Sequence, residues 1–540
     1  MIVSRSIKTL LAATFGVCVL AAAAGATSAD AAAPWLRLES GSVPGVLREG
    51  AATTEVQELK ASPGLFFGFL KGAYFELKVG GKPVGDFATE EIAAFFGLTE
   101  PTAENIQNAL EAEEFYGKGN VVVTGGPAGT ASLIVKNVNK GPVPALEATA
   151  LGEPPVGTAE AKVLTKGSVD GYITAMVANL GDADLSGGTT PLTITDTLPA
   201  GLTAVTAEGV AGTAGSPLER GPVNCTIKAA QAVSCVFEGT LPPYQAIEVR
   251  VGVLLSGAKS GEEDNHVSVI GGDAPSVEPA AHPIRVGGET PFGVESYEMT
   301  AEQEGGTLDT LAGSHPFQLT TTIALNQSED LRKPPALVKD LRVKLPPGLV
   351  GDPTPFPQCT EAQFTKRVES IDVCPDDTAI GVASVELEEP NTVRHTTVAV
   401  PIFNLVPSQG EPARFGFEPY GVPVYLDTSV RTGEDYGVTV SSNNITQLAN
   451  LILSRLTFWG VPGSASHDNS RGWSCVDDEG FQEAIEGGGA GLGPCRPLDQ
   501  HSPPPLLSMP YLLYESVSRA TPTSARAPPV PPTRPVTQGA

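Results

Sequence analysis

The strand pattern that decides the fold is clearest between residues 239 and 253, which read GTLPPYQAIEVRVGV. Val249, Val251 and Val253 occupy every second position, and polar or small residues lie between them. Because successive side chains of a β-strand point to opposite faces, this alternation gives the strand one core face and one wet face. Antiparallel sandwiches are built from strands of this kind.

The same alternation recurs before and after this stretch. Leu192 and Ile194 alternate with threonines. In the run from Phe317 to Leu325, every second residue lies on one face, and all of these residues except Thr321 are apolar. The 60 Gly and 48 Pro make about a fifth of the chain, against roughly 12% on average, which favours turn-rich β structure. We therefore expect a mainly β protein built from tandem antiparallel β-sandwich modules.

The formal net charge of -27 limits the classes of partner. Nucleic-acid binding needs clustered Lys and Arg, so no nucleic-acid partner is expected, and anionic lipid headgroups are repelled as well. Cations and cationic partners are favoured instead. The plainer interpretation is that negative charge keeps an exported protein soluble.

The N-terminus has the pattern of a secretory signal peptide over residues 1–31. Basic residues precede an apolar run from Leu10 to Ala24, and cleavage is expected before Ala32. Because residues 9–29 carry no charge, an uncleaved anchor is the alternative. No later stretch reaches about 18 uninterrupted apolar residues, so no membrane span is expected after the leader. The expected location is extracellular or at the cell surface.

Six cysteines follow the leader, and they fall in three neighbouring pairs. The pairs are Cys225 with Cys235, Cys359 with Cys374, and Cys475 with Cys495. Short separations favour local disulfides among the 15 possible connectivities, and disulfides indicate an oxidising compartment. Zinc binding is the competing interpretation, but no histidine lies within four residues of these cysteines.

Residues 32–152 carry the convincing helix signals and predict a small α+β module. Thr89 is a candidate N-cap for a helix with glutamates in its first turn and a stop at Gly97. Its apolar residues are Ile92, Phe95 and Phe96. A second helix is expected from Thr102 to about Phe115. Strands are expected at Tyr74–Val79, Asn120–Thr124 and Ser132–Val138.

Residues 169–270 resemble the conserved-repeat family called domain of unknown function 11. VANLGDADLSGGTTPLTITDTLPAGLTAV at residues 177–205 carries the resemblance together with GTLPPYQAIEVRVGV, and TDTLPAGL at 195–202 is its most specific motif. Members of that family look like immunoglobulin-type surface modules without known chemistry. The resemblance therefore implies an immunoglobulin-like sandwich and no activity.

Other stretches resemble exported bacterial proteins. The segment from Tyr74 to Leu151, with GNVVVTGGPAG, resembles a short module of large secreted bacterial surface proteins. AGSHPFQLTTTIALN and VKDLRVKLPPGLVGDPTPFPQC are similar to sequences that recur in uncharacterised exported proteins of high-GC soil bacteria. These resemblances imply secretion and assign no activity.

The patterns divide the chain into six consecutive parts. They are a signal peptide (1–31), a small α+β module (32–152), a β-sandwich repeat module (153–285), a second and larger β-sandwich module (286–460), a disulfide-closed loop region (461–497) and a disordered Pro/Arg-rich tail (498–540). The abrupt change of composition in the tail has a truncated or frameshifted end as its alternative.

No complete catalytic signature is present in the sequence. His467-Asp468 beside Ser464 and Ser466 contains the residue types of a catalytic triad, but adjacency in sequence is not triad geometry. The glycine run from Gly487 to Gly493 fails the spacing of a dinucleotide-binding turn and is interpreted as a loop. We therefore expect no enzyme and no cofactor.

One loop suggests a metal ligand set. Asp182, Asp184 and Ser186, followed by Gly187, resemble the opening of a calcium loop, in which alternating oxygen ligands and a glycine turn wrap the ion. Thr193 occupies the position where a bidentate carboxylate is expected. An ordinary turn between two strands is the plainer interpretation, and calcium remains the one candidate ion.

The function expected from these patterns is that of a secreted or cell-surface structural or interaction protein, whose modules act as spacers or adhesive surfaces. One alternative is a carbohydrate-binding protein, because exposed aromatic rings stack on sugars. Its candidate residues are Tyr420, Tyr425, Trp459 and Trp473, for which a core role is the plainer interpretation. A hydrolase with a scattered site is the other alternative. Cell-envelope or glycan components are the candidate partners.

Overall fold

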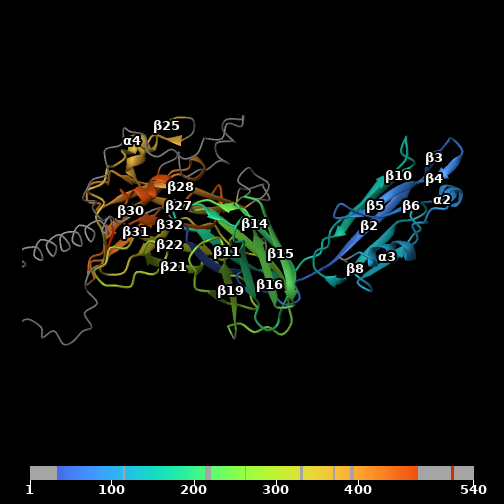
Figure 1. Ribbon diagram of the computed structural model, residues 1–540, viewed down its shortest axis with the longest axis horizontal. Helices are drawn as coiled ribbons and strands as arrows, with labels where there is room; N and C mark the ends of the chain where they lie inside the picture. Colours follow the sequence, from blue (N-terminus) through green and yellow to red (C-terminus); the bar gives the residue numbers. More distant parts are fainter. Residues whose placement is uncertain are drawn as a thin grey trace, which may run out of the picture.

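The protein folds into three units, which follow one another along the long axis of Figure 1. The computed structural model describes residues 33–113, 116–212, 220–261, 263–328, 333–368, 371–388, 395–433, 435–471 and 513–515. The predicted signal peptide (1–31) and, apart from residues 513–515, the predicted tail (498–540) lie outside the described residues. Antiparallel strands dominate the described part, which confirms the mainly β prediction.

The central β module is one continuous antiparallel sheet that folds back on itself. In sheet order it consists of β1 (Leu36–Val43), β11 (Gly171–Asn179), β18 (Ala246–Leu255), β14 (Leu202–Ala211), β15 (Pro222–Ala229), β16 (Ala232–Phe237), β13 (Leu192–Thr197), β19 (Asp264–Ile270) and β20 (Ala280–Pro283). β12 (Leu185–Ser186) pairs with β17 (Thr240–Leu241) beside it. Val249, Val251 and Val253 are buried between the two layers, as their alternation predicts.

The first strand corrects the predicted boundary of the α+β module. β1 pairs along its whole length with β11 of the central module, although residues 32–152 were predicted to form one unit. The physical reason is that Leu36 and Leu38 are buried in the core of the central module. The α+β unit is therefore an insertion between β1 and β11, and its last strand, β10, ends at Thr165.

The α+β unit contains two small antiparallel sheets, a hairpin and two helices. One sheet has the order β10 (Thr158–Thr165), β2 (Thr54–Ser62), β8 (Leu133–Lys140), β7 (Val121–Gly125), and the other β6 (Lys82–Ala88), β5 (Tyr74–Val79), β9 (Leu146–Ala150). The hairpin is β3 (Gly64–Phe66) with β4 (Leu70–Gly72), and the helices are α2 (Glu90–Phe96) and α3 (Ala103–Glu111). The second predicted helix is present as α3 but ends at Glu111, earlier than predicted, and Thr102 caps it by accepting a hydrogen bond from the Asn105 amide. Thr89 precedes α2, but its hydroxyl accepts from the Ala73 amide instead.

The C-terminal β module is a second folded-over antiparallel sheet. In sheet order it consists of β21 (Val294–Glu302), β22 (Gln318–Leu325), β32 (Asn450–Trp459), β27 (Ala379–Glu388), β28 (His395–Leu405), β29 (Arg414–Phe417), β30 (Val424–Val430), β31 (Val438–Ser442) and β23 (Leu341–Lys344). The shorter elements are β24 (Leu349–Gly351) paired with β33 (Leu513–Glu515), β25 (Arg367–Val368) paired with β26 (Ile371–Asp372), the helix α4 (Glu361–Phe364) and the 3-10 helices η1 (Asp376–Thr378), η2 (Pro419–Gly421) and η3 (Ala465–Asn469).

The two β modules pack against each other through a shared hydrophobic cluster, which includes Leu180 and Trp459, and through polar contacts beside it. This overturns the expectation of a wet face on β22. Both faces of β22 are buried. One lies inside the C-terminal sandwich, and the other carries Thr320 and Thr322 against the neighbouring elements, where the Thr322 hydroxyl contacts Glu39 of β1 at 3.2 Å. Arg455 of β32 also bonds Glu39, at 2.7 Å. The face is polar because it meets charged residues of the other module.

No helix in the described ranges is both long and apolar enough to cross a membrane.

Candidate functional site

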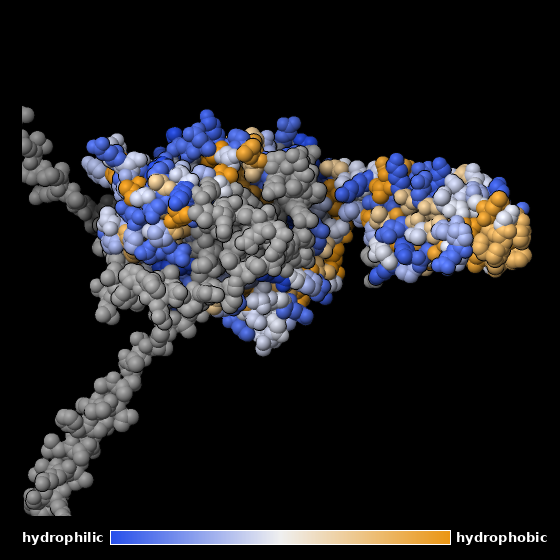
Figure 2. Space-filling view, turned by 90° about the horizontal axis from the view of Figure 1, so that it is seen from above, coloured by the Kyte–Doolittle hydropathy of each residue, from blue (hydrophilic) through white to orange (hydrophobic). Residues whose placement is uncertain are grey.

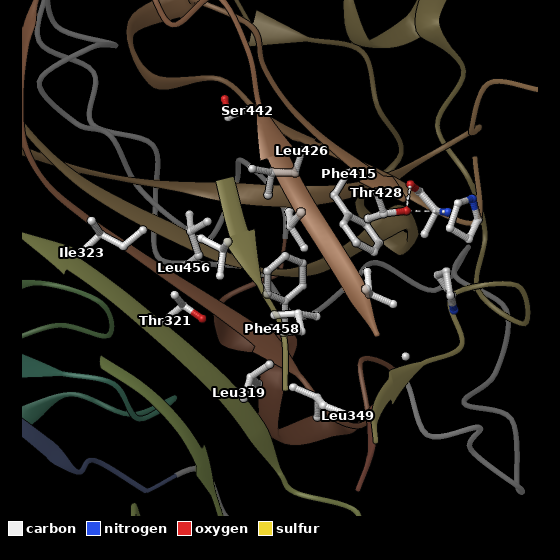
Figure 3. A pocket seen from close by; sticks show the side chains of 18 residues that line it. Leu319, Thr321, Ile323, Leu349, Phe415, Leu426, Thr428, Ser442, Leu456 and Phe458 are labelled. Atoms are coloured by element: carbon white, nitrogen blue, oxygen red, sulfur yellow. Dashed lines mark hydrogen bonds between the residues drawn. The ribbon is translucent and has the colours of Figure 1, made fainter. Parts of the chain in front are cut away.

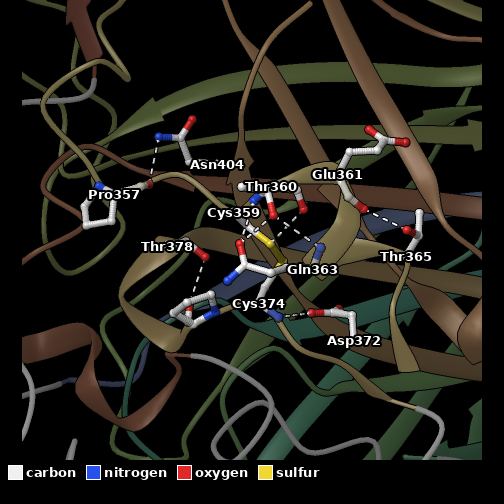
Figure 4. The surroundings of a disulfide bond; sticks show 11 residues. Pro357, Cys359, Thr360, Glu361, Gln363, Thr365, Asp372, Cys374, Thr378 and Asn404 are labelled. Atoms are coloured by element: carbon white, nitrogen blue, oxygen red, sulfur yellow. Dashed lines mark hydrogen bonds between the residues drawn. A yellow bond between two sulfur atoms is a disulfide. The ribbon is translucent and has the colours of Figure 1, made fainter. Parts of the chain in front are cut away.

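Two of the three predicted disulfides are bonded in the structure. Cys225 and Cys235 are cross-strand partners of β15 and β16, with an S–S distance of 2.04 Å. Cys359 and Cys374, with an S–S distance of 2.02 Å, close the segment that contains α4 (Figure 4), and a β-bridge from Cys359 to Leu405 holds the start of this segment beside β28. The third predicted pair, Cys475 with Cys495, lies outside the described residues, as does the glycine run 487–493.

The predicted calcium ligands do not converge on one point. Asp184 and Ser186 are exposed, whereas Asp182 is buried, and its two carboxylate oxygens are engaged by Tyr244 and His467. Across the described ranges, no three or more His, Cys, Asp or Glu residues are grouped to hold a metal ion. Calcium binding by this loop stays a prediction that titration of the purified protein with calcium can test.

Asp182 instead belongs to a buried cluster that joins the two β modules. The Tyr244 hydroxyl donates to one Asp182 oxygen at 3.3 Å, and His467 Nδ1 lies 2.9 Å from the other. The Trp459 indole donates to the Tyr244 hydroxyl at 2.9 Å and stacks on the His467 ring with 4.5 Å between centroids. Burial is the first cause that raises the pKa of Tyr244 well above its usual value, so its hydroxyl stays a donor.

This cluster leaves no room for the triad chemistry that residues 464–468 suggest. His467 is fully buried and pairs with Asp182, not with Asp468, which pairs with Arg471 at 3.1 Å. Ser464 and Ser466 bond each other at 2.8 Å. A buried imidazole that faces a structural carboxylate cannot reach a substrate from solvent, so the cluster holds the modules together.

The predicted sugar platform is not assembled from the aromatic residues that are described. Trp459 is fully buried in the core, and Tyr425 is half-buried, with Arg414 over its ring and its hydroxyl on Glu361. Trp473 and the side chain of Tyr420 lie outside the described residues. Trp459 therefore has the core role that the plainer interpretation assigned to it.

The interior of the C-terminal sandwich contains two apolar cavities. One of about 150 Å³ lies between β22 and β32 on one side and β29 and β30 on the other (Figure 3). A second of about 230 Å³ lies beside it. Leu426, Ser442 and Leu456 line both cavities and form their common wall. Both are partly open to solvent and are lined almost entirely by apolar atoms, but nothing in the described residues identifies an occupant.

The strongest candidate for a functional surface lies at the far end of the α+β unit. The right-hand end of Figure 2 is a continuous hydrophobic cluster, where Figure 1 places β3, β4 and α2. Five apolar side chains stand out from this end, and we call them the aromatic tip. They are Leu65 (66% exposed), Phe67 (70%), Phe69 (66%), Phe95 (63%) and Phe96 (47%).

A tight hairpin turn projects the first part of the aromatic tip. Phe67 (φ 52°) and Gly68 (φ 79°) are its central residues, and the Phe69 amide donates to the Phe66 carbonyl at 3.2 Å. Two consecutive residues with positive φ are typical of turns that follow the twist of hairpin strands, and the pairing of Phe66 with Leu70 leaves three residues in this loop. Asn, Asp and Gly suit these positions, whereas a bulky residue there is strained. The turn therefore keeps a phenylalanine at a conformational cost.

The short helix α2 supplies the second part. Ile92 and Ala93 are buried against Leu70 and Val156, and they fix the helix to the hairpin. Phe95 and Phe96 point away from this small core, and the Phe96 ring meets Phe66 of the hairpin with 5.6 Å between centroids. Rings from two elements thus form one surface.

Charged groups lie directly behind the aromatic tip and are paired with one another. The Lys71 ammonium lies 3.4 Å from a Glu90 carboxylate oxygen, and the Lys71 amide donates to Glu91 at 2.8 Å. These contacts tie β4 to the first turn of α2. The tip itself carries no charge.

Reasoning from periodicity missed the aromatic tip. Phe95 and Phe96 were predicted as apolar positions of a helix together with Ile92, and only Ile92 is buried. The turn sequence GLFFGFL, at residues 64–70, has neither helical nor strand periodicity. Its signal is the density of Phe next to a glycine turn, because a tight turn exposes whatever side chains it carries.

Comparisons with known proteins assign no family. No protein-family model matches the chain, and no curated protein matches it. Among solved structures, the chain is similar to BcpA, the major pilin subunit of Bacillus cereus, with 9% sequence identity and a TM-score of 0.16, over 78% of this chain and 95% of that chain. A similarity at this TM-score does not define a shared fold, and we take no role from it.

Proposed function

We propose that this protein is an exported structural or interaction protein of the cell surface, without catalysis of its own, and that it binds its partner through the aromatic tip. The observation that carries the proposal is the exposure of five side chains without a polar atom at one end of the molecule. Contiguous exposed apolar patches mark interaction sites in soluble proteins. The two β modules then serve as the support that holds the tip away from the rest of the molecule (Figure 1).

Support for a rigid base comes from the interface between the β modules. The buried cluster of Asp182, His467, Tyr244 and Trp459 joins them at one place, and the ion pair between Arg455 and Glu39 joins them at another. Buried hydrogen-bonded groups are costly to separate, because each loses its partner. The two modules are therefore expected to move as one body.

The two chain segments that connect the α+β unit to the central β module, which we call the neck, support a fixed position of that unit. The chain enters through residues 44–53 and returns through residues 166–170. Asp170, which is buried, accepts hydrogen bonds from the amides of Ala52 at 2.7 Å and Leu255 at 2.9 Å. One carboxylate thus connects both strands of the neck to β18.

Support for export comes from the two local disulfides together with the expected leader. Disulfides persist where thiols are oxidised, outside the cytoplasm. The test is to express the full chain in an exporting bacterial host, fractionate the cells and titrate free thiols. We expect the protein in the surface and medium fractions, without titratable thiols at Cys225, Cys235, Cys359 and Cys374.

The role of the aromatic tip is tested in the same cells. In a variant with Phe67→Ser, Phe69→Ser and Phe95→Ser, the fraction retained on the envelope should fall, with the remainder released into the medium. The matched control replaces three equally exposed apolar residues elsewhere with Ser, namely Ile270 (69% exposed), Leu311 (71%) and Leu448 (76%). Equal retention of both variants would remove the tip from the proposal, and recovery of reduced protein in the cytoplasm alone would remove the surface role.

A further inference from the structure

We infer that the aromatic tip inserts into the interface of an uncharged lipid bilayer, an inference that rests on the proposed function and names the partner of that surface. The occupant is the boundary between headgroups and hydrocarbon chains of a zwitterionic membrane. Four properties of the tip favour this partner over a protein: its area, its chemistry, its backbone and the charges around it.

The exposed area of the tip is small for a stable protein complex. Taking about 200 Å² for each fully exposed side chain, the exposed fractions of the five residues amount to about 600 Å². A partner in a stable complex buries about 800 Å². Two tips of two copies would therefore bury about 1,200 Å² in total, at the lower limit of the range for stable complexes. Insertion of a few apolar side chains is sufficient for reversible association with a membrane.

The chemistry of the tip fits hydrocarbon. The five side chains are Phe and Leu, and none of them has a hydroxyl, an amide or a charge. Binding hot spots between proteins are enriched in Trp, Tyr and Arg, which combine apolar area with a polar group. A purely apolar tip gains from leaving water without needing a matching donor or acceptor on the other side.

The backbone of the hairpin is partly hydrogen-bonded within itself. β3 and β4 pair at Gly64 with Gly72, Leu65 with Lys71 and Phe66 with Leu70, and the turn closes with the bond from Phe69 to Phe66. Lipid hydrocarbon offers no donors or acceptors, so backbone that satisfies itself enters it most cheaply. A closed hairpin turn meets that condition better than an open loop, and the outer edges of this two-stranded sheet limit insertion to the hydrated interface.

The charges around the tip limit how deeply it inserts and which lipids it binds. Lys71 lies opposite Leu65 in the hairpin, and its contacts with Glu90 and Glu91 place paired charges at the base of the tip, which limits insertion to the level of the headgroups. The net charge of -27 repels anionic lipid, so binding depends on the apolar term and not on a basic patch. The geometry therefore points to a zwitterionic bilayer.

The test uses the full chain, purified after export, and phosphatidylcholine vesicles. The protein should float with the vesicles. The triple variant of Phe67, Phe69 and Phe95 to Ser should bind at least roughly tenfold more weakly. The control variant of Ile270, Leu311 and Leu448 to Ser should bind like the unchanged protein. Addition of anionic phosphatidylglycerol to the vesicles should weaken binding at low salt. Circular dichroism of both variants verifies that they are folded.

A fluorescent probe reports insertion directly. The α+β unit contains no tryptophan, so Phe67→Trp places a single indole in the tip. Its emission should shift to shorter wavelength when phosphatidylcholine vesicles are added, whereas emission of Leu311→Trp should not change.

The outcomes separate this inference from the proposed function. Failure of the unchanged protein to bind vesicles, or equal binding by the triple Ser variant, overturns lipid insertion. A dimer in analytical ultracentrifugation that the triple Ser variant abolishes also overturns it, because a second copy then covers the tip. If vesicle binding fails while tip-dependent retention on cells persists, the proposed function stands and only the lipid partner is wrong. If both fail, both proposals are wrong.

Discussion

At the scale of single residues, the interface between the β modules depends on Asp182. Its carboxylate accepts from Tyr244 and lies against His467, and all three side chains are buried. Arg471 donates to the carbonyls of Pro462 and Ser464 and so holds the chain that carries His467. One carboxylate of the central module thus organises the end of the C-terminal module.

Asp182→Ala should destabilise the protein strongly. The substitution leaves the Tyr244 hydroxyl and the His467 ring buried without their acceptor, and removing one partner of such a buried pair costs about 3 kcal/mol. The measurement is the free energy of unfolding in urea. Asp184→Ala, two residues away and exposed, is the control and should change stability by less than about 0.5 kcal/mol. A similar effect of the two substitutions would contradict the assigned role of Asp182.

At the scale of elements, the hairpin β3–β4 joins a strained turn to a surface that the fold itself does not use. Phe67 has φ 52°, in the left-handed region, and its side chain is 70% exposed. A residue that is both strained and exposed adds little to stability. Strain of this kind clusters at binding sites, which agrees with a tip selected for contact with a partner.

Phe67→Asn should therefore stabilise the protein and weaken its binding. Asn adopts positive φ more readily than Phe in this type of turn, which predicts a gain of about 0.5 to 1 kcal/mol. Thermal unfolding measures the gain, and vesicle flotation measures the loss of binding. Phe69→Asn is the control, because Phe69 lies outside the strained positions; it should weaken binding without stabilising the protein. A loss of stability in Phe67→Asn would argue against strain in the turn.

Elements also differ in how well the sequence predicts them. β5 occupies Tyr74–Val79, as predicted, and α2 ends at Gly97 in the left-handed conformation that suits glycine. These signals are local, since they depend on residues a few positions apart. The buried outer face of β22 was not predicted, because its cover comes from residues such as Glu39, far away in the sequence.

At the scale of the whole molecule, buried carboxyl groups connect stability to pH. Burial raises the pKa of Asp196 in the central module to about 6, although the nearby Asn265 opposes the shift. Burial also raises the pKa of Glu295 to about 7 and lowers that of His282, 3.4 Å away, to about 4. Glu295 and His282 belong to different β modules, so their protonation state affects the interface, whereas Asp196 acts within the central module.

The shifts of Glu295 and His282 should nearly cancel. From about pH 4.5 to 6.5 the folded pair holds one proton, on Glu295, and the unfolded pair also holds one, on His282. Equal proton binding by the two states makes stability independent of pH. Asp196 then contributes to the pH dependence in this range, in the same direction as Glu302 and Asp376, whose pKa values burial also raises.

We therefore expect the protein to become more stable on mild acidification. Folded Asp196 keeps its proton up to about pH 6, whereas the unfolded side chain loses it near pH 3.8. Its contribution is present at low pH and is lost as the pH rises through about 6, an effect of about 3 kcal/mol. The measurement is the free energy of unfolding between pH 4 and pH 7. Asp196→Asn should flatten the curve, and an unchanged curve in that variant would assign the dependence to other groups.

By itself, the sequence determined the features that arise from neighbouring residues: the alternating strands, the end of α2 at Gly97 and the local pairs Cys225–Cys235 and Cys359–Cys374. Short-range periodicity, turns and loop closure act over a few residues, so one sequence suffices to predict them. Only the tertiary structure decided that β1 joins the central sheet, that β22 is buried on both faces and that Phe95 and Phe96 are exposed. The reason is that burial depends on which distant segment covers a face, and periodicity carries no information about that partner.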